Sequence, residues 1–232
     1  LVYYGDVTGD DMQAVSSTKR VANYYRFNFT KDDNPSSHWS YLYSIIQNCN
    51  LILMNIDKLV IDEDDKAYRD DLKGEALAIR GLALFDLTRI FGYPYLKDDG
   101  ASLGVPIIEG LSTIDSKPTR NTVAQCYTKI IDDLTQSLSL LGEKFNKGKI
   151  NKWGAMVLLS RVYLYKGENA NALKMASDAI IGAEKNKYAL WTNEDYPTAW
   201  GEDASASKPG EVLFEIVNLT TDSPGKESMG YL

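Results

Sequence analysis

The chain has 232 residues, of which 44% are hydrophobic and 25% charged, and its net charge is −7. This length can bury a sizeable core, and the composition is that of an ordinary globular protein. The acidic balance argues against nucleic acid as a partner, because phosphate binding requires clustered Lys and Arg, but it is compatible with neutral ligands such as glycans.

Residues 1–37 form a polar segment rich in turn signals such as 32–35, Asp-Asp-Asn-Pro. The segment combines aromatic rings with short polar groups. This mixture suits sugar recognition, because rings stack on pyranose faces while Asp, Asn and Arg bind hydroxyls. The candidate ligand-binding residues are Asp11, Arg20, Tyr24, Tyr25, Phe27 and Asn28. The alternative is a packed N-terminal arm without ligand contact.

Apolar residues at every third or fourth position predict five amphipathic helices. Their expected ranges are 38–59, 66–91, 121–141, 151–166 and 169–185. Gly92 and Pro94 end the second helix. The loop that follows, 93–119, is long enough to indicate a functional segment or an insertion. After Tyr188 the periodicity stops, and residues 211–216 are the one predicted strand.

The fourth and fifth helices fit the tetratricopeptide pattern of a helix–turn–helix repeat. The pattern's large, small, aromatic and turn positions hold Leu159, Ser160, Tyr163, Gly167, Ala172 and Ala179. One repeat cannot bury its own face, so the second and third helices must be its neighbour, with Arg80 or Gly81 at the small position. The predicted fold is all-α: a tetratricopeptide-like α-solenoid core with long irregular loops and little β structure.

Arg80 lies on an otherwise apolar helix stripe near Glu75 and Asp86. We expect it to form a buried bidentate pair with a carboxylate rather than to contact a ligand. Asn50 is expected to bond a neighbouring backbone group. Cys49 and Cys126 fall inside helical patterns and are expected to be buried free thiols.

Several motifs, taken in order, resemble those of the SusD/RagB family. They are Trp39-(x3)-Tyr43-(x2)-Ile46-(x3)-Asn50, Gly74-Glu75-Ala76-(x3)-Arg80-(x4)-Phe85-(x2)-Thr88-(x2)-Phe91-Gly92-(x)-Pro94, Gly104-Val105-Pro106, Arg120-(x2)-Val123-(x3)-Tyr127-(x2)-Ile130-(x2)-Asp133-Leu134, Leu158-Leu159-(x)-Arg161-Val162-Tyr163-Leu164 and Glu211-Val212-Leu213-Phe214-Glu215. Each motif alone is weak, but their common order across 39–217 indicates membership.

The resemblance implies an outer-membrane lipoprotein on the cell surface that binds glycan or peptide and passes it to a SusC-like TonB-dependent transporter. It implies a protein that is not an enzyme, and no cofactor or metal is expected. Membrane contact would come only through a lipid anchor upstream of Leu1, since residues 1–4 are not a signal peptide. In this family the segment before the first helix also contributes to the ligand site.

Because such proteins are about twice as long, the resemblance implies that residues 1–232 are a single SusD-like N-terminal region. It comprises an irregular arm (1–37), a helical-repeat core (38–186), and a loop with a short strand (187–232), and it stops before the C-terminal part. Trp191, Tyr196 and Trp200 offer a second candidate site in the 188–210 loop.

Two other functions remain open. A plain tetratricopeptide scaffold would bind a protein segment in its concave face. An all-α glycoside hydrolase would use two of the many carboxylates. The sequence has no G-x-S-x-G elbow, glycine-rich phosphate loop or HExxH motif, so catalysis finds little support. The particular glycan or peptide is not specified by any motif.

Overall fold

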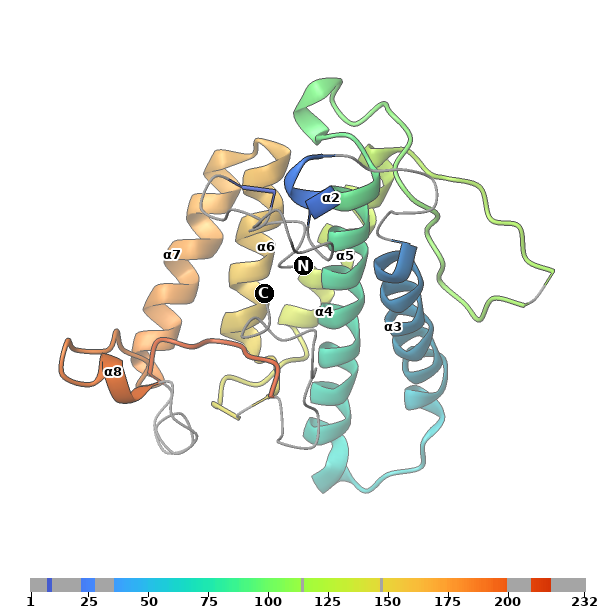
Figure 1. The fold of residues 1–232 in the computed structure, drawn as a ribbon. Coiled ribbons are helices and arrows are strands. Elements are labelled where there is room, and N and C mark those ends of the chain that lie inside the picture. Colours follow the sequence, from blue (N-terminus) through green and yellow to red (C-terminus); the bar gives the residue numbers. More distant parts are fainter. Residues whose placement is uncertain are drawn as a thin grey trace. The chain divides into compact units, whose positions relative to one another are not determined.

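Five long helices run through the part of the chain that the structure describes (Figure 1). They are α3 (Ser36–Asn55), α4 (Lys66–Phe91), α5 (Val123–Leu138), α6 (Lys152–Lys166) and α7 (Asn169–Lys185). The structure is a computed structural model that describes residues 8–9, 22–27, 36–113, 115–146, 148–199 and 210–217. All five predicted helices are confirmed, and α4 and α7 begin and end where the sequence predicts.

Two short helices accompany them, α2 (Ala22–Tyr25) and α8 (Tyr196–Ala199). The predicted irregular arm and the turn-rich segment after Tyr188 therefore each contain one helical turn. Single 3-10 turns follow α3 (Ile56–Lys58), precede α4 (Glu63–Asp65) and open the long loop (Tyr95–Lys97).

The helix ends follow from local sequence chemistry. Thr122 and Gln125 form a capping box at the start of α5, each side chain bonding the other's backbone N–H. Asn151 caps α6 by accepting a hydrogen bond from the Gly154 amide at 3.1 Å. Gly167 ends α6 with φ +85°, a left-handed conformation that glycine adopts without strain.

Consecutive helices pack against one another from α4 to α7. In the α6–α7 hairpin, Leu159, Ala172 and Ala179 are buried, and Ser160 Oγ donates to the Ala172 carbonyl at 2.9 Å. Gly81 takes the small position between α4 and α5, because an added Cβ would lie 3.1 Å from Leu134 Cγ. The predicted all-α, tetratricopeptide-like fold is confirmed.

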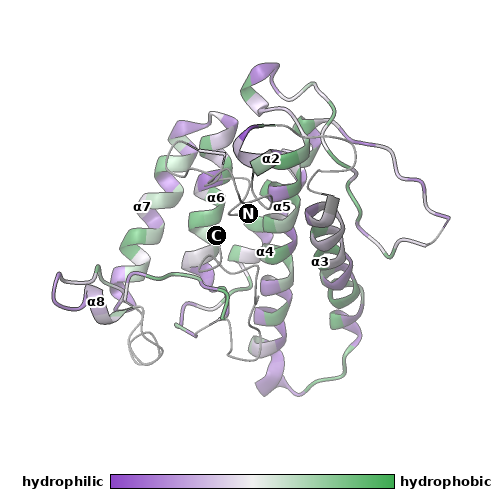
Figure 2. Cartoon of the chain, in the orientation of Figure 1, coloured by the Kyte–Doolittle hydropathy of each residue, from purple (hydrophilic) through white to green (hydrophobic). Residues whose placement is uncertain are grey.

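Figure 2 shows that α4 changes character along its length. Its first turns are hydrophilic, and its buried residues lie between Gly74 and Thr88. The later turns therefore form the core, while the first turns border solvent.

The strand predicted at 211–216 is wrong, because these residues pair with no strand within the described ranges. Val, Leu and Phe favour extended backbone, but a strand also needs a partner. The segment instead packs on the helical core: Leu213 contacts the cluster around Trp153 and Tyr188. Its carbonyl lies so close to α6 that a Cβ at Gly154 would meet it at 3.2 Å.

The chain divides into two units, residues 1–39 with 218–232 and residues 40–217, and each is described by itself. Both cysteines are free and buried, as expected. Among the helices of the described ranges, none has the length and apolarity needed to cross a membrane.

Candidate ligand-binding site

The aromatic residues predicted for the ligand site lie on and just after α2. Tyr24 and Tyr25 are its last two residues, and the Phe27 amide bonds the Tyr24 carbonyl at 3.1 Å to close the turn. Tyr25 is 37% exposed and Phe27, at φ +52°, is 67% exposed. Two aromatic side chains therefore stand at the surface of this unit within three residues of each other.

The other three candidates, Asp11, Arg20 and Asn28, lie outside the described residues. The structure thus places the three aromatic candidates next to one another, while the ligand site itself stays a prediction.

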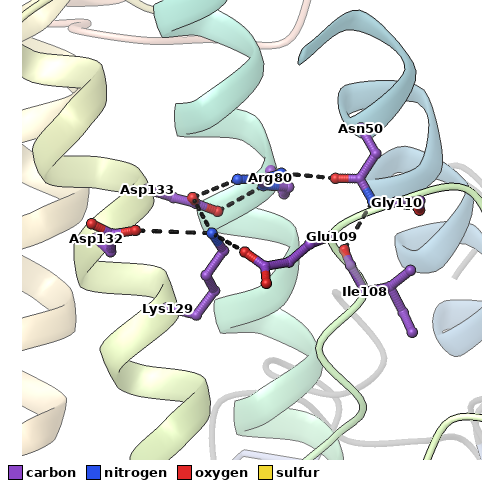
Figure 3. Close-up of polar contacts among 8 residues, drawn as sticks. All are labelled: Asn50, Arg80, Ile108, Glu109, Gly110, Lys129, Asp132 and Asp133. Atoms are coloured by element: carbon purple, nitrogen blue, oxygen red, sulfur yellow. Dashed lines mark hydrogen bonds and ion pairs between the residues drawn. The ribbon is translucent and has the colours of Figure 1, made fainter. Parts of the chain in front are cut away.

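Arg80 lies in a buried polar network and not in an open site (Figure 3). Its Nε and Nη2 atoms donate to the two carboxylate oxygens of Asp133 at 2.8 and 2.6 Å. The predicted bidentate pair is confirmed, with a partner on α5. The two carboxylates near Arg80 in sequence pair elsewhere, Asp86 with Arg89 and Glu75 with Lys149.

The network extends from α4 to α3 and to the long loop (Figure 3). Arg80 Nη1 donates to Asn50 Oδ1 at 2.8 Å. Asn50 Nδ2 donates to the carbonyls of Ile108 and Gly110 at 2.8 and 3.0 Å, which confirms its predicted backbone contact. Nearby, the Tyr43 hydroxyl donates to the Pro106 carbonyl at 2.7 Å. These motif residues fix the loop to the helices.

A second cation completes the network. Lys129 lies 2.6 Å from Glu109 Oε1 and 3.2 Å from Asp133 Oδ1. Burial opposes the charge on Arg80, but its hydrogen bonds to Asp133 and the nearby negative charges together outweigh burial and raise its pKa. The bond from Lys129 lowers the pKa of Glu109. Both shifts favour the charged forms, so the pairs persist at neutral pH.

The space beside this network is too small for a sugar. The cavity lined by Arg80, Lys129 and Asp133 has a volume of about 10 Å³. A volume of that size holds at most one water molecule. The buried polar residues Asn50, Arg80 and Asp133, on α3, α4 and α5, therefore act in the scaffold.

Two of the three residues of the second predicted aromatic site lie in contact. The rings of Trp191 and Tyr196 meet edge to face with centroids 6.1 Å apart. Gly210 lies against the indole, where a Cβ would be 2.2 Å from Nε1. The third member, Trp200, lies outside the described residues.

No metal centre is found among the residues that the structure describes, since no three His, Cys, Asp or Glu side chains there are grouped to hold an ion. The carboxylates of the acidic turn at 62–65 form no such group.

The sequence did not identify Asp133, Lys129 or Glu109 as partners in the buried network. They are 53, 49 and 29 residues from Arg80 in the sequence. Helical periodicity predicts which face of a helix is buried, but it does not predict which other helix packs against that face. The Asp133-Leu134 pair in the third helix's motif was the available signal, because an Asp beside apolar core positions needs a buried partner.

The protein is an all-α repeat protein. Its consecutive helices pack on one another and include a tetratricopeptide-like hairpin, and buried polar residues hold its long loop against the helices. The sequence profile of the SusD-like family, described as "Starch-binding associating with outer membrane", matches residues 2–164. The chain belongs to the SusD-like family.

Solved structures and a curated sequence agree with this assignment. The chain is 80% identical to a putative sugar binding protein from Bacteroides vulgatus, with a TM-score of 0.94 over 99% of this chain and 52% of that one. A SusD superfamily protein, also from Bacteroides vulgatus, is 40% identical, with a TM-score of 0.88 over 99% of this chain and 52% of that one. A SusD-like protein from Bacteroides ovatus is 28% identical over 57% of this chain and 23% of its own length.

The chain thus spans about half the length of these solved structures and about a quarter of the curated relative.

Proposed function

We propose that this chain is part of a non-catalytic protein that binds a glycan at the cell surface and delivers it to a SusC-like TonB-dependent transporter. The observation that carries the proposal is the 80% identity, over 99% of the chain, to a putative sugar binding protein. A more distant relative, 25% identical with a TM-score of 0.61, was solved with a xylogluco-oligosaccharide. Both support a glycan as the ligand class.

Within this chain the proposal assigns glycan contact to the arm around α2. Tyr25 and Phe27 expose ring surface there, and stacking on sugar rings needs such surface. The proposal adds Asp11, Arg20, Tyr24 and Asn28, whose polar groups would bind hydroxyls beside the rings.

The cellular setting follows from the family. Its description is association with the outer membrane, which supports a location on that membrane. Our proposal is more specific. The protein lies on the extracellular face, is held there by a lipid anchor, and caps the transporter.

Binding of a glycan panel to the full-length protein tests the ligand class. Maltooligosaccharides and xyloglucan oligosaccharides would be titrated by calorimetry, with peptides of similar length as a second arm. We expect saturable binding of at least one glycan and no new reducing ends after prolonged incubation. Binding of peptides alone would overturn the glycan assignment, and sustained release of sugar would overturn the non-catalytic assignment.

The transporter partnership needs its own experiment. The full-length protein, tagged and expressed in its native membrane, would be purified in mild detergent. We expect a SusC-like transporter in near-stoichiometric amount. Its absence would remove the delivery step while leaving glycan binding intact.

One observation favours a second function, a tetratricopeptide scaffold that binds a protein segment. Leu173 and Ile180, seven residues apart on α7, are exposed on the same side of the repeat hairpin. If peptides bind the full-length protein and no glycan does, this alternative replaces the first.

A further inference from the structure

Three segments that are distant in sequence enclose a cleft of about 870 Å³ within residues 40–217. They are the first turns of α4, the stretches 139–146 and 149–151 of the connection between α5 and α6, and Asn186 after α7. In Figure 1 this connection lies beside the lower end of α4. The volume falls within the range of about 300–1,000 Å³ typical of small-molecule sites.

Hydrogen bonds between the segments hold the walls of the cleft in place. The Gly142 amide donates to Asp71 Oδ1 at 2.8 Å, which ties the connection to α4. Asn151 Nδ2 donates to the Tyr188 hydroxyl at 2.6 Å. Asn186 Nδ2 donates to Glu143 Oε2 at 3.3 Å. The cleft is therefore largely preformed, which lowers the entropic cost of binding.

An exposed aromatic ring stands on one wall. Tyr68 is 59% exposed and lies near the start of α4. The buried residues of this helix begin further along, at Gly74. Lys149 Nζ lies 5.3 Å from the centre of its ring and 3.7 Å from Glu75 Oε1. The ammonium steadies the ring, and the exposed ring surface can stack on an apolar sugar face.

The charges around the cleft nearly balance. Three carboxylates, Asp70, Asp71 and Glu143, face two ammonium groups, Lys144 and Lys149. A polyanion would require clustered cations, which the described lining residues do not supply. Mixed carboxylates, amides and an aromatic ring match instead a neutral ligand rich in hydroxyl groups.

We infer that this cleft is a second saccharide-binding site, with Tyr68 as its stacking platform and the surrounding carboxylates and amides as hydroxyl partners. The inference rests on the proposed glycan-binding function but concerns surfaces other than the α2 arm. All of its residues belong to the helical core, so a long glycan could be held at two places on one protein.

The test uses the full-length protein carrying 3-fluorotyrosine at position 68 and the glycan that binds tightest in the panel. We expect the ¹⁹F resonance of residue 68 to shift as glycan is added and to saturate. We also expect Tyr68→Ala to weaken binding of the longest oligosaccharides at least threefold, while Tyr68→Phe, which keeps the ring, stays near wild type.

Tyr41→Ala is the matched control, because Tyr41 is also an exposed helical tyrosine, 72% accessible, but does not line the cleft. A wild-type protein that binds glycan while the Tyr68 resonance stays fixed and Tyr68→Ala binds normally would overturn this inference alone. A wild-type protein that binds no glycan would overturn the proposed function and this site with it. Retained melting temperatures show that the variants are folded.

Discussion

Arg80 and Asp133 join α4 to α5 through two parallel hydrogen bonds, Nε to Oδ2 at 2.8 Å and Nη2 to Oδ1 at 2.6 Å. Both side chains are buried, Asp133 completely. The guanidinium uses its remaining edge for Asn50, so one arginine links three elements. The geometry makes this pair the centre of the scaffold that positions the long loop.

Asp133→Asn should destabilise the protein by about 3–5 kcal/mol, because it leaves the buried Arg80 charge without its counter-charge. Urea unfolding at neutral pH measures the loss. Asp132→Asn is the matched control. The Asp132 carboxylate is 53% exposed and lies 3.9 Å from Lys129 Nζ, so this substitution should change stability by less than about 0.5 kcal/mol. Equal losses for the two variants would contradict a structural role for the buried pair.

Asn50→Ala should loosen the loop at 106–112. Without the amide, the carbonyls of Ile108 and Gly110 lose their donor and Arg80 loses an acceptor, at a cost of about 1–3 kcal/mol for each buried group left unpaired. Hydrogen exchange should quicken at the Ser112 amide, which bonds the neighbouring Gln47. Asn55→Ala, which breaks only local bonds to the Leu51 carbonyl and from the Lys58 ammonium, should leave that exchange unchanged.

Gly182→Ala should strain the α6–α7 hairpin. An added Cβ would lie 2.1 Å from Cζ3 of the Trp153 ring, which is only 6% exposed and cannot swing into solvent. Overpacking of this kind costs about 1–3 kcal/mol, more than the helix propensity that alanine gains. Thermal unfolding of Gly182→Ala and Gly110→Ala would be compared, since nothing lies within 4 Å of a methyl group at Gly110. A stable Gly182→Ala protein would refute this close packing.

Glu75→Gln should stabilise the protein at neutral pH and not at low pH. Burial raises the pKa of Glu75 despite the ammonium of Lys149. A carboxyl whose folded pKa is raised contributes its stability below the unfolded pKa, near 4.5, and loses it as the pH rises through the folded value. The neutral amide avoids that loss. Urea titrations at pH 4 and pH 7 should therefore show a gain for Glu75→Gln only at pH 7, and a gain independent of pH would argue against the ionised carboxylate as its cause.

The helices were predictable because their signals are local. Gly92 and Pro94 mark the end of α4, and periodic apolar residues give its length. The strand at 211–216 was not, because β-propensity does not supply a pairing partner, and Leu213 packs on Trp153 and Tyr188 instead.

The candidate sites also differ in whether local sequence could predict them. Clustered rings in the arm were visible in sequence, and Tyr25 and Phe27 are indeed exposed. The cleft beside Tyr68 was not visible, because its walls come from α4, the stretches 139–146 and 149–151, and Asn186. Only tertiary packing brings these segments together, so no local pattern identifies Tyr68 among fifteen tyrosines.

Tyr25→Ala should weaken glycan binding by the full-length protein about two- to tenfold, because an aromatic contact contributes roughly 0.5–1.5 kcal/mol. Tyr25→Phe should keep most of the affinity if ring stacking, rather than the hydroxyl group, makes the contact. Calorimetry with the best glycan of the panel measures both, beside Tyr41→Ala as an exposed tyrosine on α3. If Tyr25→Ala and Phe27→Ala both bind like wild type while the wild type binds well, the arm is a packed segment and the glycan is held elsewhere. The ¹⁹F signal of Tyr68 then decides whether the cleft is that place.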